Sequence, residues 1–308
     1  MTGARSLLLA ALLALAPASV RAHATEPAPA SCGAGGLQLQ VLGSGGPELA
    51  GGRAASSHLV WVDGKARVLV DFGPGAALRF AQSGARASDL DVALFTRVHA
   101  GHTLDFPALV AAALREERRR TLPVYGPPGG RLAPSTVNYT RALLDGARGA
   151  YRHLGIVLNP LAAEGFRLDP HDARAPTERV GVRRERAEIW EVHRSADLRV
   201  SATALAREGA PALAWRVVAR GRRIVFIDTP GAGESGRLVR FAANADVVVA
   251  GAHTPAALAG IARLAERARA KHLIVAGGVP TEMRGNGGPS SYRGPVAYAE
   301  DLACFPVP

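Results

Sequence analysis

Residues 95–102 read Phe95-Thr-Arg-Val-His-Ala-Gly-His102, a loop with two histidines that directly follows an apolar run beginning at Val92. Short apolar runs bounded by turn residues are typical of buried strands. The segment 92–96 is therefore predicted to be a strand that leads into this loop. A His-x-x-His pair by itself is common by chance, so its meaning depends on the rest of the chain.

Other strand-like runs on both sides of this loop also end in glycine-bearing or aspartate-bearing turns. They are Val41-Leu-Gly-Ser-Gly-Gly46, Leu69-Val-Asp-Phe-Gly-Pro-Gly75, Leu122-Pro-Val-Tyr-Gly-Pro127 and Val225-Phe-Ile-Asp-Thr229. Strands are predicted at 37–42, 58–62, 67–71, 122–125, 212–220, 223–227, 246–250 and 272–276. Helices are predicted at 75–82, 106–115, 137–144, 238–242 and 255–270. The region 136–195 reads as irregular and arginine-rich apart from its helix. This order of elements favours an α/β domain with two sheets flanked by helices.

The composition is basic but only partly informative. The 308 residues carry a formal charge of +11, and of the 37 Lys and Arg only Lys65 and Lys271 are lysines. Such a charge suggests either a nucleic-acid or anionic-surface partner or an arginine-biased composition, which we favour. A phosphate-binding loop of the Gly-x-x-x-x-Gly-Lys type is excluded because neither lysine lies in one.

The N-terminal segment resembles a secretory signal. Arg5 precedes an apolar run from Leu7 to Ala16, and Ala22-His-Ala24 offers an A-x-A cleavage site. We therefore expect a signal peptide at 1–24, a linker at 25–36 and a folded domain at 37–308. Cleavage would lower the charge to +9, and the product is expected to be periplasmic or secreted, with no membrane segment after cleavage.

Cys32 and Cys304 are the cysteines of the chain. In an oxidising compartment such a pair is more often bridged than free, so we predict a disulfide between them.

In this order and spacing, the five fragments resemble the metallo-β-lactamase superfamily, in its ribonuclease Z and arylsulfatase-like phosphodiesterase branch. The resemblance covers roughly residues 37–308. It implies a single-domain αββα sandwich with a dinuclear metal site where the loops of the two sheets meet. A metal-bound hydroxide there would attack a phosphoryl, sulfuryl or carbonyl centre.

This chain departs from the family's ligand pattern at several positions. The family loop reads His-x-His-x-Asp-His, whereas here Arg97 and Gly101 replace the first histidine and the aspartate. A later histidine is expected near Arg207, and the last ligand is expected at Gly277. The resemblance retains His99, His102 and Asp228 as metal ligands, with Asp228 as the bridging and candidate catalytic aspartate. Asp71 matches a family aspartate that does not bind metal itself but lies next to the metal ligands.

Each metal would keep one histidine and the shared aspartate, whereas zinc normally has three or four protein ligands. We therefore expect the dinuclear hydrolase site to be lost and the protein to be a non-catalytic or ligand-binding descendant. Alternatively, His99, His102 and Asp228 hold one divalent metal, most simply zinc, in an active phosphodiesterase or sulfatase. A further hypothesis places the charges of Arg97 and Arg207 where the metals once sat, facing Asp228 and a small anionic ligand.

The remaining motifs are less informative. The Ser56-Ser-His58 run reads as a turn before a strand, and His253 is expected to cap the helix that follows it. His193 could replace a lost ligand. Export argues against a ribonuclease Z-like nuclease, so no nucleic-acid partner is expected, and the oligomeric state is left open.

Overall fold

The computed structural model describes residue 32 and residues 35–46, 51–160, 165–180, 183–205, 209–228, 235–278, 289 and 291–308. The predicted signal peptide, most of the predicted linker and Arg207 lie outside these residues, and those interpretations stay predictions. Within the described part of the chain, no helix combines the length and the apolar character needed to cross a bilayer.

Among the described residues, seven strands form the first sheet, in the spatial order β16-β1-β2-β3-β4-β5-β6. Its strands are β1 (Leu37–Gly43), β2 (Ser57–Val62), β3 (Lys65–Val70), β4 (Val92–Leu94), β5 (Leu122–Gly126), β6 (Leu168–Asp172) and β16 (Cys304–Pro306). The pairs from β16 to β3 are antiparallel and those from β3 to β6 are parallel.

Seven other strands of the described chain form the second sheet, in the order β15-β14-β13-β12-β11-β10-β9. They are β9 (Trp190–Arg194), β10 (Leu198–Leu205), β11 (Ala212–Ala219), β12 (Arg222–Ile227), β13 (Val247–Gly251), β14 (His272–Ala276) and β15 (Val296–Tyr298). Here β12 to β15 pair parallel and β9 to β12 antiparallel, so the two sheets repeat one arrangement.

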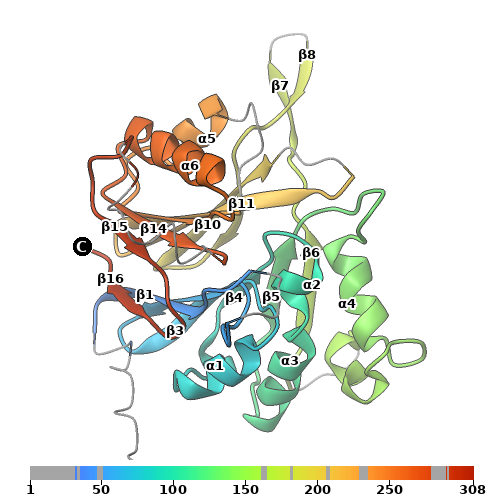
Figure 1. Cartoon of the computed structure of the whole chain (residues 1–308). Coiled ribbons are helices and arrows are strands. Elements are labelled where there is room, and N and C mark those ends of the chain that lie inside the picture. Colours follow the sequence, from blue (N-terminus) through green and yellow to red (C-terminus); the bar gives the residue numbers. More distant parts are fainter. Residues whose placement is uncertain are drawn as a thin grey trace, which may run out of the picture.

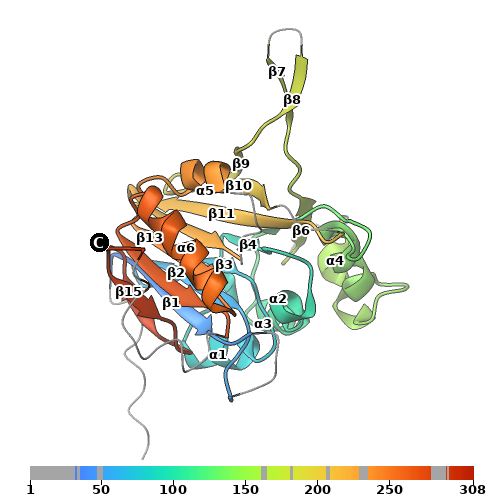
Figure 2. The same ribbon diagram turned by 45° about the horizontal axis from the view of Figure 1, so that its top comes forward.

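Helices cover the outer face of each sheet, which completes an αββα sandwich (Figures 1 and 2). The helices beside the first sheet are α1 (Ala76–Gln82), α2 (Ala100–Thr103), α3 (Phe106–Arg115) and α4 (Thr136–Leu144), with the short 3-10 turns η1 (Ala87–Asp89) and η2 (Arg152–Leu158). Those beside the second sheet are α5 (Ser235–Phe241) and α6 (Pro255–Arg267). The predicted α/β sandwich is confirmed.

Buried side chains form three layers of core that follow this architecture. Leu39, Val60 and Trp215 belong to the layer between the two sheets. Phe95 and Phe106 belong to the layer beneath α3, and their rings meet edge to face at 5.0 Å. The third layer packs the second sheet against α5 and α6. Burial of these apolar surfaces is the main stabilising contribution to the fold.

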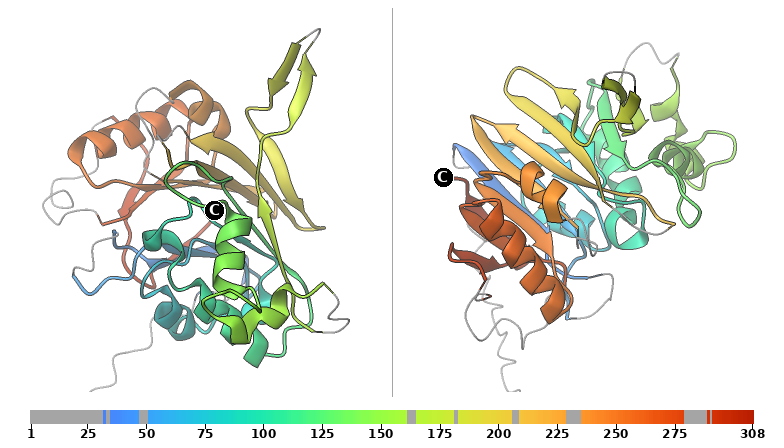
Figure 3. Two further views of the ribbon diagram at one scale, coloured as in Figure 1. Left: turned by 90° about the vertical axis from the view of Figure 1, so that its right-hand side faces the viewer. Right: turned by 90° about the horizontal axis from the view of Figure 1, so that it is seen from above.

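The prediction of irregular structure over 136–195 is wrong in part. This region contains β6 and β9, and also β7 (Thr177–Val180) and β8 (Arg183–Arg186), a two-stranded hairpin. The hairpin projects away from the body of the sandwich (Figure 3). Strand β6 is held by pairing with β5, which is distant in sequence, and β9 is held by pairing with β10, the next strand of the chain.

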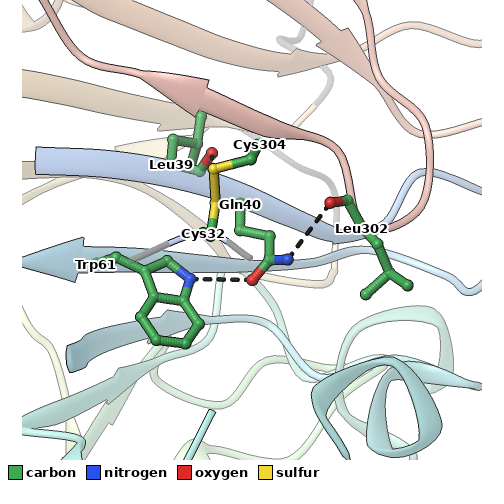
Figure 4. Close-up of a disulfide and its surroundings, with 6 residues drawn as sticks. All are labelled: Cys32, Leu39, Gln40, Trp61, Leu302 and Cys304. Carbon is green, nitrogen blue, oxygen red and sulfur yellow. Dashed lines mark hydrogen bonds between the residues drawn. A yellow bond between two sulfur atoms is a disulfide. The ribbon is translucent and has the colours of Figure 1, made fainter. Parts of the chain in front are cut away.

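The predicted disulfide between Cys32 and Cys304 is present, with a Cα–Cα distance of 5.7 Å across 272 residues of sequence. It attaches β16 to the start of the described chain, beside β1 (Figure 4). Next to it, the indole of Trp61 donates to Gln40 Oε1 at 3.0 Å, and Gln40 Nε2 donates to the Leu302 carbonyl at 3.3 Å. The late segment of the chain is thus joined to the first strands by covalent and polar contacts.

Candidate functional site

A small cavity, called here the central pocket, lies where loops of the two sheets meet. Its volume is about 40 Å³. The charged and histidine side chains that line it are His58, Asp71, Arg97, His102, Asp228 and His253.

Most of these side chains follow the carboxyl ends of parallel strands. Asp71 comes after β3, Arg97 and His102 after β4, Asp228 after β12 and His253 after β13. In sheets of this kind, ligand sites lie beyond the carboxyl ends of the strands. The topology therefore collects polar groups from distant parts of the sequence at one place.

Asp71 organises one side of the central pocket. Its backbone has a φ of 58°, a left-handed conformation that aspartate tolerates better than most residues. The buried carboxylate accepts from the Thr96 amide at 2.8 Å and from the Thr96 hydroxyl at 2.8 Å. It also lies 2.8 Å from His102 Nδ1 and 3.3 Å from the Ser56 hydroxyl. With Nδ1 held by a carboxylate, Nε2 is the ring nitrogen of His102 that remains for the pocket.

Arg97 and Asp228, which also line the pocket, form an ion pair. Arg97 Nε lies 3.1 Å from Asp228 Oδ2, and the two side chains are 19% and 6% exposed. The Nε hydrogen is not aligned with an acceptor, so the contact is electrostatic rather than a well-formed hydrogen bond. The retained aspartate thus faces a guanidinium from the position where the resemblance implies a metal-binding histidine.

His99 takes a different role from the one that the resemblance implies. It is the N-cap of α2, where its Nδ1 accepts from the Gly101 amide at 3.2 Å, and it is exposed. It does not line the central pocket, and its ring centre is 6.2 Å from that of His102. The structure therefore brings His102 and Asp228 to the pocket but leaves His99 outside it.

This chain aligns over most of its length with solved structures of one fold. A metallo-beta-lactamase fold protein of Bacillus subtilis, YhfI, aligns with a TM-score of 0.62 and 15% identity over 87% of this chain and 98% of its own. The human tRNase Z short form aligns with a TM-score of 0.60 and 19% identity, over 88% of this chain and 99% of its own. A diphosphatase of the PhnP family gives 0.59 and 15%, over 87% of this chain and 96% of its own. This chain has the metallo-β-lactamase fold. No family profile and no curated protein sequence matches it.

Two positions of this metallo-β-lactamase fold where ligands are expected are occupied by glycines with structural roles. Gly101 donates its amide to His99 inside α2. Gly277 has a φ of 81°, and a Cβ there would lie 3.2 Å from the Gly251 Cα and 3.5 Å from His253 Cε1. A histidine at 277 would therefore be strained.

His253 occupies the space beside Gly277. The expectation that it caps α6 is wrong, because the Thr254 side chain is the N-cap and accepts from the Ala257 amide at 3.2 Å. His193 lies away from the central pocket, with its ring 6.2 Å from that of Tyr125.

The residues that line the pocket do not fit the metal centre that the metallo-β-lactamase fold implies. No group of three or more His, Cys, Asp or Glu side chains is placed to hold a metal ion anywhere in the described ranges. A guanidinium beside Asp228 also disfavours a divalent cation at the same carboxylate, because the two positive charges would repel each other. We therefore derive no chemical step through a metal here.

His58 is a pocket residue for which the sequence predicts no site role: the Ser56-Ser-His58 run reads as a turn, whereas Ser57 and His58 begin strand β2. It lies on β2, is 5% exposed, and neither ring nitrogen has a hydrogen-bond partner of good geometry in the described structure. Burial lowers the pKa of His58 to about 4. The negative charge of Asp71 and the Val70 backbone raise this pKa but only partly offset the effect of burial. The signal that could have identified it is a histidine in an otherwise apolar strand, Ser-His-Leu-Val-Trp-Val.

Proposed function

We propose that this protein is an exported metallo-β-lactamase-fold protein that has lost dinuclear hydrolase chemistry and binds a small anionic ligand in its central pocket. The observation that carries the proposal is the ion pair between Arg97 and Asp228. A permanent guanidinium charge neutralises the aspartate, which removes the need for a cation at that place.

The donor groups of Arg97 support an anionic ligand. A guanidinium has five N–H donors, and among the described residues the only ion pair of Arg97 is the one that its Nε makes with Asp228. The terminal nitrogens can then serve a ligand in the pocket, where hydrogen bonds to a charged group are stronger than those between neutral groups.

The alternative function is a mononuclear metallohydrolase that uses His99, His102 and Asp228. It is favoured by one observation, the carboxylate that holds His102 Nδ1, because metal-binding histidines usually donate their other nitrogen in this way. It requires the His99 ring to leave its capping position and Asp228 to leave Arg97. The tRNase Z and the diphosphatase of similar fold suggest a phosphate ester as the substrate class for this alternative.

Elemental analysis and turnover together test the proposal. We expect the purified full chain to contain less than stoichiometric Zn, Mn or Fe and to leave bis-p-nitrophenyl phosphate intact, with or without added metal. The Arg97→Met variant should lose anion binding. Stoichiometric metal with turnover that disappears in His99→Ala would instead establish the mononuclear enzyme. Mass spectrometry of the protein recovered from its native host would test cleavage after Ala24 and export.

A further inference from the structure

The ligand of the central pocket must satisfy two groups that the protein leaves incompletely bonded. His58 is buried, and its ring has one contact with a backbone acceptor, that of Val70, which is too poorly aligned to count as a full hydrogen bond and engages at most one of the two ring nitrogens. An unsatisfied buried polar group destabilises the folded state, so its persistence here points to a partner outside the chain. Arg97 lines the same pocket.

The charges around the pocket favour a ligand with one negative charge. Arg97 is already paired with Asp228, and Asp71 also lines the pocket. Because the His58 ring is neutral at pH 7, it offers a hydrogen bond but no positive charge. Sulfate and dianionic phosphate would bring a second negative charge toward these two aspartates, which disfavours them.

The shape and walls of the pocket favour a planar anion with a short hydrocarbon part. The terminal edge of a guanidinium matches the two oxygens of a carboxylate. The pocket is also lined by the apolar side chains of Val70, Phe226 and Val249, and the Phe226 ring centre is 5.5 Å from that of His58. The small volume of the pocket, about 40 Å³, favours a small ligand.

We propose that the central pocket binds a short-chain monocarboxylate, of the size of acetate or propionate, through the Arg97 guanidinium and the His58 imidazole. The hydrocarbon part lies against Phe226 and Val249. This proposal rests on the proposed anion-binding function and names its ligand class.

The test compares anions on the full chain at pH 7.5 and constant ionic strength. Thermal unfolding and calorimetric titration are run with acetate, propionate, sulfate, phosphate and chloride. We expect saturable binding of the carboxylates in the millimolar range, because ligands of so few atoms bind weakly, with propionate the tightest. The other anions should not bind. Saturation by phosphate or sulfate but not by carboxylates would overturn the carboxylate assignment and leave the anion-binding function standing. Binding of none of these anions would overturn both.

Variants at His58 test its part in recognition. His58→Leu should raise the melting temperature of the ligand-free protein, because a buried polar group is removed, and weaken propionate about tenfold. His58→Gln, which keeps a donor and an acceptor, should bind propionate more tightly than His58→Leu does. The exposed His153→Leu serves as the matched control and should change neither quantity. Unchanged propionate affinity in His58→Leu would contradict the role of His58. If the leucine variant does not fold, His58→Met, which also removes both ring nitrogens, is measured in its place.

Discussion

Replacing Arg97 by methionine tests the idea that a guanidinium has taken over the electrostatic role of a metal. Methionine keeps much of the side-chain volume but removes the guanidinium that pairs with Asp228. At the 3.1 Å separation of the pair, the Coulomb attraction is about 5 kcal/mol for an effective dielectric constant near 20. Much of this is offset by the cost of dehydrating both groups, and Arg97 is 19% exposed. We therefore expect the free energy of unfolding to fall by about 2–3 kcal/mol.

Urea titration followed by tryptophan fluorescence measures this loss, because Trp61 and Trp215 are buried. The melting temperature should fall by about 5 °C. The matched control is Arg240→Met, since Arg240 Nη2 is 2.6 Å from Glu188 Oε2 but both side chains are well exposed, at 60% and 58%. That exposed pair should contribute less than about 1 kcal/mol.

A double variant with Asp228→Asn separates the pair from its surroundings. The double variant should lose less unfolding free energy than the two single variants lose together. Each single variant removes one partner of the buried pair, whereas the double variant removes both charges. The reasoning is refuted if Arg97→Met unfolds at the same urea concentration as the wild type, or if the two single losses are additive.

Other regions give further expectations. Replacing Cys32 and Cys304 together by serine should lower the free energy of unfolding by about 2–5 kcal/mol, measured by urea titration against the oxidised protein; an unchanged midpoint would contradict the stabilising role. Asp301→Asn should accelerate hydrogen exchange at the Ser44 amide, which donates to that carboxylate, and exchange at the wild-type rate would count against the contact. As the pH falls from 7 to 4, the unfolded imidazole of His58, with a pKa of 6.5, takes up a proton before the folded one, whose pKa is about 4. The wild type should therefore lose up to about 3 kcal/mol more than His58→Leu over this range, and parallel pH profiles would contradict the assignment.

Local signals were sufficient for much of the fold. The helix Phe106–Arg115 and the strand His272–Ala276 have the predicted bounds, because a proline in the first turn and a continuous apolar run mark them. Strands β6 and β9 lack such signals, since partly exposed positions dominate their burial patterns. Pairing decides their conformation: β6 pairs with β5, which is distant in sequence, and β9 pairs with the next strand, β10. The hydrophobic pattern of either strand alone does not contain that information.

The pocket residues that come directly after strands could be predicted from the sequence. Asp71, His102 and Asp228 reach one pocket because each comes after a strand of the parallel parts. The position of His99 was not predictable, because the Gly101 amide converts it into a helix cap, and spacing alone does not distinguish a cap from a ligand. His58 enters the pocket through packing against Phe226 of the other sheet, a contact that has no counterpart in local sequence.

The contacts of Asp301 bear on when the central pocket can form. This carboxylate accepts from the Ser44 amide at 3.0 Å and from the Ala54 amide at 2.8 Å, and it pairs with Arg79 at 2.9 Å. The Gly278 amide in turn donates to the Ser44 carbonyl at 2.9 Å. One wall of the pocket is thus assembled from the beginning and the end of the domain. A partly synthesised chain that ends just before Asp301 holds every residue that lines the pocket but lacks the carboxylate that joins Ser44, Ala54 and Arg79. Ligand binding therefore reports completion of the chain and not merely the presence of the pocket residues.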